Sequence, residues 1–382
     1  MNALFNNYSR RPISLVEGKG TIVKDSEGKS YLDFTSGIAV LCLGHSHPSL
    51  VKALQEQSEK IWHTSNLFES PGQVKLAESL VKDLHLDHAF FCNSGAEANE
   101  AAIKMARKHT GKHHIITFEN SFHGRTFGAM SATGQEKIHK GFGPLVDQFT
   151  YLPFNDVERL ENSIDDSIAA IMLEVVQGEG GVNPITDEFA EAIQKICSEN
   201  DIILIVDEVQ TGIGRSGTRF AFEQTALKPD LVSMAKGLGG GFPFAGVLGT
   251  SKLYDTFSPG SHGTTYGGNP LGVAVSQAVI DTVFQDAFLD EVKEKGAYLV
   301  NKLNEVFSNE PVVVRGKGLL IGIDFGDVEV APFVSKLEED GLLVVSAGAH
   351  VLRLLPPLTV SYEEIDQAIN ILESVVLSQL VK

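Results

Sequence analysis

The sequence predicts a doubly wound α/β fold, in which helices cover both faces of a mostly parallel sheet. Short apolar runs recur through the middle of the chain, and most lack the polar alternation of a half-exposed strand. Amphipathic stretches typical of helices separate several of them, most clearly Ala96–His109 and Glu188–Asn200. The predicted strands are Ala89–Cys92, Ile115–Phe118, Ala169–Leu173, Ile202–Val206, Leu231–Met234 and Ala245–Leu248.

The two ends of the chain have a different pattern. Residues 15–34 predict a small β-meander, and the chain after Pro270 predicts a long helical stretch to about Asn309. A last helix is expected from Tyr362 to Leu380, with Ser361 as its N-cap and two glutamates in its first turn. The C-terminal strands are expected at Val312–Val314, Leu319–Phe325, Gly341–Ser346 and Val351–Leu355.

These patterns predict a large central domain and a smaller α+β domain that both chain ends build. We expect an N-terminal segment of the small domain at residues 1–50, a large cofactor-binding domain at 51–270 and a C-terminal small domain at 271–382.

Composition restricts the class of protein. Of the 382 residues, 43% are hydrophobic and 21% charged, which excludes a disordered chain. The net charge of −18 makes nucleic acid and anionic membranes poor partners, because such binding depends on Lys and Arg. There is no CxxC motif, no secretory signal and no apolar run of about 20 residues, so we expect a cytoplasmic protein without structural disulfides. His109, His113 and His114 follow a predicted helix, and we expect a solvated loop there and no metal.

Three polar segments follow predicted strands, where ligands of open α/β sheets bind. Asn93–Glu97 opens a helix with small residues, which predicts either a phosphate-binding helix start or a simple cap. Asp207 ends a buried strand, either as a ligand for a cation or as a structural carboxylate. Lys236 precedes the glycine cluster Gly237–Gly241 and is either a partly buried nucleophile or a solvated lysine.

Together these segments match the requirements of pyridoxal 5′-phosphate. The lysine forms the Schiff base, the aspartate keeps the pyridine nitrogen protonated, and the helix start holds the phosphate.

The chain resembles the class III aminotransferases of pyridoxal-phosphate fold type I over essentially its whole length. The resemblance rests on Ser121–Thr126, Asp207–Arg215 and Thr264–Pro270, together with Asn93–Glu97 and Lys236. It implies a seven-stranded, mostly parallel sheet in the large domain. Within this class, Phe34–Val40, Leu43–Pro48 and His63–Phe68 are most similar to the acetylornithine aminotransferases.

The resemblance implies a role for each matching residue. Lys236 is the catalytic lysine, Asp207 the partner of the ring nitrogen, and Thr265 contacts the phosphate in the neighbouring subunit of a homodimer with shared active sites. Phe122 stacks on the ring, and Gln210 lies near the ring hydroxyl. The other cofactor-binding residues implied are Ser94, Gly95, Ala96 and His123.

Substrate carboxylates require cations, and guanidinium groups bind them at two points. By resemblance Arg353 binds the α-carboxylate, the alternative being a structural buried ion pair. Glu179 is expected to pair with Arg353 until 2-oxoglutarate arrives, and Arg125 then takes its second carboxylate. Thr264 is the fourth substrate-binding residue implied.

The resemblance implies transfer of the distal amino group of N²-acetylornithine to 2-oxoglutarate through pyridoxamine phosphate. The products are N-acetylglutamate 5-semialdehyde and glutamate, in arginine biosynthesis. Ornithine, succinylornithine and 4-aminobutyrate aminotransferases remain alternatives, since they use the same cofactor residues. A pyridoxal-dependent aminomutase would turn over without 2-oxoglutarate. A non-enzymatic cofactor-binding regulator would carry a partner-binding module, and no segment suggests one.

Overall fold

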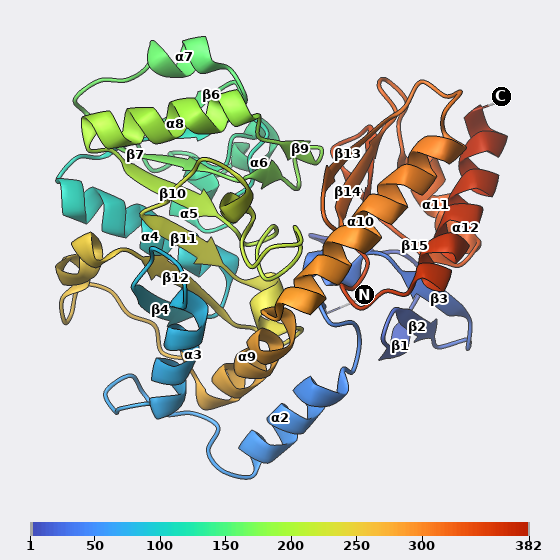
Figure 1. Cartoon of the computed structure of the whole chain (residues 1–382), viewed down its shortest axis with the longest axis horizontal. Coiled ribbons are helices and arrows are strands. Elements are labelled where there is room, and N and C mark those ends of the chain that lie inside the picture. The colour runs from blue at the N-terminus through green and yellow to red at the C-terminus, as the bar shows by residue number, and fades with distance from the viewer. Residues whose placement is uncertain (1–2, 381–382) are drawn as a thin grey trace.

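The computed structural model describes residues 3–380, and a seven-stranded sheet forms its core (Figure 1). The strand order is β4-β12-β11-β10-β7-β5-β6, and only β12 runs antiparallel to its neighbours. All six strands predicted for the middle of the chain are confirmed, and each predicted strand end lies within one residue of the observed end. The strands are β4 (His88–Cys92), β5 (His114–Phe118), β6 (Phe149–Leu152), β7 (Ile168–Leu173), β10 (Ile203–Asp207), β11 (Leu231–Met234) and β12 (Ala245–Gly249).

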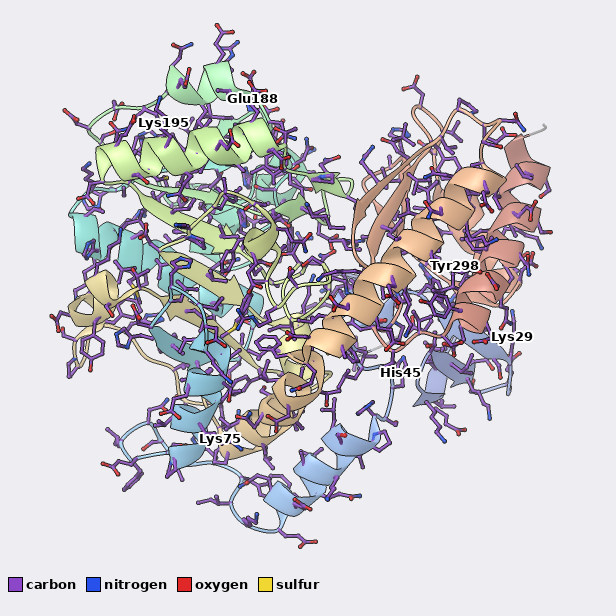
Figure 2. The ribbon with its side chains drawn as sticks, in the orientation of Figure 1. Lys29, His45, Lys75, Glu188, Lys195 and Tyr298 are labelled. Atoms are coloured by element: carbon purple, nitrogen blue, oxygen red, sulfur yellow. The ribbon has the colours of Figure 1, made fainter. Side chains whose placement is uncertain are left out.

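Helices cover both faces of this sheet, which explains its continuous apolar strands. Along β10, Ile203 and Ile205 join the apolar cluster under α4, whereas Leu204 and Val206 join the cluster that contains the apolar side of α8. Side chains alternate across a strand, so both alternating sets are apolar when both faces are buried. The outward side chains of α8, such as Glu188 and Lys195, point away from the sheet (Figure 2).

The predicted helices of this region are confirmed as α4 and α8. The capping box of α4 and the Thr186 side chain at the start of α8 fix where the two helices begin. The helices up to residue 283 are α1 (Ser36–Ala39), α2 (Pro48–Ser58), α3 (Pro71–Val81), α4 (Gly95–Thr110), α5 (Phe127–Ala132), α6 (Glu136–His139), α7 (Val157–Glu161), α8 (Asp187–Asn200) and α9 (Pro270–Val283). Short 3₁₀ turns are η1 (Ala221–Gln224), η2 (Lys236–Gly239) and η3 (Ser251–Phe257).

The two chain ends lie together on one side of the molecule (Figure 1). The N-terminal meander is β1 (Leu15–Lys19), β2 (Ile22–Asp25) and β3 (Ser30–Asp33), and β3 pairs in parallel with β15 (Leu342–Leu343). A second sheet has the order β13-β14-β17-β16. Its strands are β13 (Val313–Lys317), β14 (Leu320–Asp324), β17 (Val351–Leu354) and β16 (Val345–Ala347), beside helices α10 (Asp286–Val306), α11 (Ala331–Glu339) and α12 (Tyr362–Leu380).

The long helical stretch predicted after Pro270 is confirmed, and it consists of two helices, α9 and α10. The chain breaks at Phe284 and Gln285, where the backbone of Gln285 is extended. The reason is packing, since α9 lies against α2 and α3, whereas α10 lies against α12 and β13.

The predicted strand at Gly341–Ser346 is two strands that belong to different sheets. β15 extends the N-terminal meander and β16 the C-terminal sheet, with the buried Val344 between them. The N-cap of α12 is confirmed. The Glu364 N–H donates to Ser361 Oγ at 3.1 Å, and the Ser361 N–H donates to the Glu364 carboxylate at 2.9 Å.

The turn that links the meander to α2 contains a left-handed segment. Ser36, Gly37, Ile38 and Ala39 all have positive φ angles between 46° and 65°. The buried Asp33 carboxylate accepts hydrogen bonds from the Thr35 and Ser36 N–H groups and thereby holds its start. Among residues 3–380 no helix is long and apolar enough to cross a membrane.

Candidate active site

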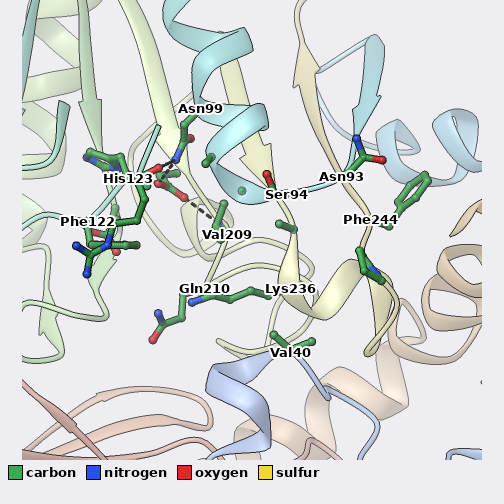
Figure 3. A pocket seen from close by; sticks show the side chains of 18 of the residues that line it. Val40, Asn93, Ser94, Asn99, Phe122, His123, Val209, Gln210, Lys236 and Phe244 are labelled. Atoms are coloured by element: carbon green, nitrogen blue, oxygen red, sulfur yellow. Dashed lines mark hydrogen bonds and ion pairs between the residues drawn. The ribbon is translucent and has the colours of Figure 1, made fainter. Parts of the chain in front are cut away.

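A cavity of about 460 Å³ lies where the predicted site residues meet, beyond the carboxyl ends of β4, β10 and β11 (Figure 3). The segments that follow all three strands meet at this edge of the sheet, so side chains far apart in sequence converge there. The cavity is lined by the predicted residues Ser94, Gly95, Ala96, Phe122, His123, Arg125, Asp207, Gln210 and Lys236.

Lys236 follows β11 in a strained conformation, with a φ of 42°. Such left-handed geometry is uncommon outside glycine and concentrates at functional sites. Burial lowers the pKa of Lys236 to about 8; Arg353 also lowers it, while the carboxylates of Glu179 and Asp207 oppose the shift. The amine is therefore neutral in a substantial fraction of molecules near pH 8, which a nucleophile or a general base requires.

Asp207 is fixed by three donors. Its Oδ2 accepts from Asn99 Nδ2 and from His123 Nδ1, both at 2.8 Å, and its Oδ1 accepts from the Val209 N–H at 3.0 Å. The residue is 3% exposed, so these bonds are what stabilise a charged carboxylate in the interior. The arrangement presents a fixed negative charge to a ligand in the cavity.

The start of α4 leaves backbone donors unused. Ser94 Oγ accepts from the Glu97 N–H, and the Glu97 carboxylate accepts from the Asn93 and Ser94 N–H groups. The N–H groups of Gly95 and Ala96 have no hydrogen-bond acceptor among residues 3–380. A Cβ on Gly95 would lie 2.9 Å from Val209 Cγ1, so glycine is needed for this close approach. Such a helix start binds phosphate.

Phe122 is half-buried and lines the cavity beside Arg125. Its N–H donates to Glu174 Oε2 at 3.1 Å, and the Arg125 guanidinium carbon lies 5.6 Å from its ring centroid. Burial raises the pKa of Glu174 to about 7, with the Asp207 charge adding to the effect and His123 opposing it. Arg125 is exposed, so its charge is available at the mouth of the cavity.

Arg353, Glu179 and Gln210 form a triangle beside the cavity. Arg353 is 1% exposed, and its Nη1 donates to Glu179 Oε1 at 2.6 Å and to Gln210 Oε1 at 2.9 Å. Gln210 Nε2 donates to Glu179 Oε1 at 3.3 Å. Burial raises the pKa of Glu179, but the charge and hydrogen bonding of Arg353 outweigh it and the net shift is downward. A carboxylate therefore occupies Arg353.

Neither of the two predicted threonines lines this cavity. Thr264 Oγ1 accepts from Asn93 Nδ2 at 3.1 Å and lines a neighbouring cavity. Thr265 is exposed and lines neither of these cavities.

Sequence reasoning missed Asn99, Glu174 and Val209. Glu174 directly follows β7, so the rule that selected Asp207 would have found it. Asn99 lies four residues after Gly95, on the same side of the helix among alanines, and a polar residue there was a usable signal. Val209 gave no signal, because a valine side chain has no chemistry that would mark it as a site residue.

These groups fit pyridoxal 5′-phosphate in chemistry. The chain offers a lysine amine of lowered pKa, a fixed carboxylate for a ring nitrogen, a flat aromatic side chain and open helix-start donors for a phosphate. The glycine at residue 95 keeps the approach to those donors clear.

Comparison with known proteins decides the family. The model of the class III aminotransferase family matches residues 5–376. The chain belongs to this family. As a member it is a pyridoxal-phosphate-dependent aminotransferase, in agreement with the sequence prediction.

Individual relatives share this family. The acetylornithine aminotransferase of Listeria innocua is 54% identical over 383 residues, covering 100% of this chain and 99% of its own. That of Bacillus subtilis is 50% identical, covering 98% of both chains. The structure of N-acetylornithine aminotransferase from Stenotrophomonas maltophilia has a TM-score of 0.85 at 36% identity, covering 98% of both chains. The ornithine aminotransferase of Toxoplasma gondii has a TM-score of 0.94 at 31% identity, covering 98% of this chain and 92% of its own.

Proposed function

We propose that the protein transfers the distal amino group of N²-acetylornithine to 2-oxoglutarate, giving N-acetylglutamate 5-semialdehyde and glutamate. One observation carries the choice of amine: among residues 3–380, no acidic side chain that lines the cavity is free to pair with a second ammonium group. Its two lining carboxylates, Glu174 and Asp207, are buried and hydrogen-bonded. A neutral acetamido group is tolerated beside Val40 and Phe242, whereas an unpaired ammonium there would be costly.

When bound, pyridoxal phosphate supplies an aldehyde for the amino group and a ring that accepts electrons. With the cofactor bound, Lys236 Nζ would take a proton from the amine-bearing carbon of the substrate and deliver it to the former aldehyde carbon of the cofactor, which its lowered pKa allows. Asp207 would keep the ring nitrogen protonated, and the Gly95 and Ala96 N–H groups would hold the phosphate. The Phe122 ring excludes water from one side of the site.

Two arginines recognise the carboxylates of the substrates. Arg353 takes the α-carboxylate of 2-oxoglutarate after Glu179 releases it, and Arg125 at the mouth takes the second carboxylate. With N²-acetylornithine, Glu179 keeps Arg353 occupied, so the single carboxylate is directed to Arg125 and the distal amine reaches Lys236. The close Glu179–Arg353 pair supports this exchange.

Ornithine is the second candidate amine, because the structure of the Toxoplasma gondii ornithine aminotransferase has the higher TM-score of the two structures compared. Steady-state kcat/KM values with N²-acetylornithine, ornithine, N²-succinylornithine and 4-aminobutyrate test the choice. We expect N²-acetylornithine to exceed ornithine by about tenfold or more, because each desolvated, unpaired charge costs several kcal/mol. Equal values would refute the argument from the cavity, and turnover without 2-oxoglutarate would indicate an aminomutase.

We further propose a homodimer in which each site is completed by Thr265 and Thr264 of the neighbouring subunit. Exposed apolar side chains support this. Trp62, Leu67, Phe68 and Tyr266 are 64–89% exposed, and they flank the threonine segment in sequence or lie on the loop before α3. Asn66 in that loop donates to the Gly267 carbonyl at 3.0 Å, so the two segments are in contact. An apolar surface of this kind is typical of an interface.

The domain boundaries, the cellular location and the pathway follow from the same reading of the chain. We propose that residues 51–270 form the large domain and that residues 1–50 and 271–382 form the small one, since β3 of the N-terminal segment pairs with β15. We place the enzyme in the cytoplasm and in arginine biosynthesis, where the reverse direction forms N²-acetylornithine.

A further inference from the structure

The turn that carries Glu179 is seated on the C-terminal sheet between two arginines. It joins β8 (Val176–Gln177) to β9 (Asn183–Pro184) and consists of residues 178–182. Figure 1 shows β9 reaching toward β13, and contacts between the two strands confirm it.

The register of the C-terminal sheet explains why residues 178–182 pack against it. Gly322 of β14 lies opposite Arg315 of β13 on one side and opposite Arg353 of β17 on the other. Directly opposed residues project from the same face of a sheet, so the two arginines flank a position that has no side chain. Val182 fills that position, because a Cβ on Gly322 would lie 2.8 Å from Val182 Cβ.

Arg315 binds the backbone at one end of the turn through hydrogen bonds. Its Nη2 donates to the Gly181 carbonyl at 2.8 Å, and its Nε donates to the Val182 carbonyl at 3.0 Å. Its Nη1 is paired with Asp324 Oδ2 at 2.6 Å, which fixes the guanidinium. These hydrogen bonds hold Val182 at a φ of 55°, a conformation that a β-branched residue rarely adopts.

Arg353 binds the other end of the turn through a side chain instead of the backbone. Its partner is the Glu179 carboxylate, which a substrate carboxylate can replace. The partners of Arg315 are backbone carbonyls, which no anionic substrate replaces. One arginine contact is therefore exchangeable, and the other is permanent.

We propose that Arg315 is a positioning residue for the substrate exchange at Arg353. It keeps residues 178–182 seated, so that Glu179 leaves and recaptures Arg353 by a movement of its side chain alone. The inference rests on the proposed roles of Glu179 and Arg353. Without the permanent contact, Glu179 spends less time at Arg353, and a dicarboxylate competes for this arginine more easily.

The test measures binding of glutarate, a five-carbon dicarboxylate without a reacting carbonyl, to the cofactor-loaded enzyme by calorimetry. Arg315→Lys keeps the charge but loses the fork. We expect it to lower the Kd for glutarate by at least about threefold, in the same direction as Glu179→Gln. In a Glu179→Gln background, Arg315→Lys should have no further effect, because the residue acts only through Glu179.

A second variant guards against a folding defect. Val182→Ala removes the methyl groups that pack over Gly322 without a change of charge. We expect the same fall in Kd together with faster amide exchange over residues 176–184. The Gln177 Nε2 bond to the Glu119 carbonyl remains in both variants, so the hairpin should persist. Arg219→Lys is the matched control, since Arg219 bonds the Lys82 carbonyl and Glu223 elsewhere.

The alternative outcomes are distinct. An unchanged or raised Kd in Arg315→Lys, or an equal change in both backgrounds, would overturn the positioning role. Glutarate that fails to bind the wild-type enzyme, or binds Arg353→Lys equally well, would instead overturn the proposed function of Arg353.

Discussion

His123 and Asp207 are joined by a 2.8 Å hydrogen bond between Nδ1 and Oδ2, and both side chains are buried. An ionised carboxylate only accepts, so Nδ1 carries the proton and donates. Asn99 donates to the same oxygen from α4. Helix α4, whose first N–H groups we propose as the phosphate donors, thus also orients the carboxylate that we propose as the partner of the ring nitrogen.

Replacing Asp207 with asparagine should retain cofactor binding but lower turnover about a hundredfold or more, because the fixed charge at the ring nitrogen is lost. Steady-state rates and the absorption of bound cofactor check this. Asp201→Asn is the matched control, since Asp201 is exposed after α8 in a left-handed conformation that asparagine also tolerates. Near-normal turnover in Asp207→Asn would contradict the assigned role.

The lowered pKa of Lys236 predicts a pH-dependent reactivity in the cofactor-free protein. Its amine is protonated and unreactive at low pH and becomes neutral as the pH rises through about 8, rather than through the ordinary value of 10.5. Labelling with an amine-reactive reagent, followed by peptide mass spectrometry, should therefore show a midpoint near pH 8 at Lys236. Glu179→Gln should move the midpoint lower, because the Glu179 charge raises the pKa of Lys236. A midpoint near 10.5 would refute the shift.

Arg353→Lys should raise the KM for 2-oxoglutarate by at least about tenfold, since a lysine cannot form the two-point contact with a carboxylate. The KM for N²-acetylornithine should change less, because its carboxylate is directed to Arg125. Half-reaction kinetics with each substrate separate the two effects. An equal rise for both substrates would indicate a structural role for Arg353.

The exposed apolar loop before α3 predicts a self-association surface. Leu67→Asp combined with Phe68→Asp should convert the proposed dimer into a monomer, as measured by light scattering. The double variant should also lose activity, because Thr265 would no longer reach the neighbouring site. Val313→Asp changes an exposed valine at the start of β13 and should leave the dimer intact. A double variant that remains dimeric would place the interface elsewhere.

Much of the fold was predictable, because strands buried on both faces leave continuous apolar runs. β6 (Phe149–Leu152) was missed because it is a half-buried edge strand. Two of its four residues, Thr150 and Tyr151, carry hydroxyl groups, so the strand leaves no continuous apolar run. The break between α9 and α10 was missed because it is set by packing against different partners and not by a local glycine or proline.

The site was predictable where chemistry and strand ends coincide, as for Asp207 and Lys236. It was not predictable where a residue acts through another. Arg315 lies 38 positions before Arg353 in sequence, and only the register through Gly322 brings the two to the same face.

The central claim is that Lys236 carries the cofactor and performs the amino transfer. Reduction of the cofactor-loaded enzyme with borohydride, followed by peptide mapping, tests it most directly. After reduction we expect one pyridoxyl phosphate group per chain, on Lys236. The visible absorption of the unreduced enzyme should be absent in Lys236→Ala, and N²-acetylornithine added before reduction should prevent the labelling of Lys236. A label on another lysine, or none, would contradict the account.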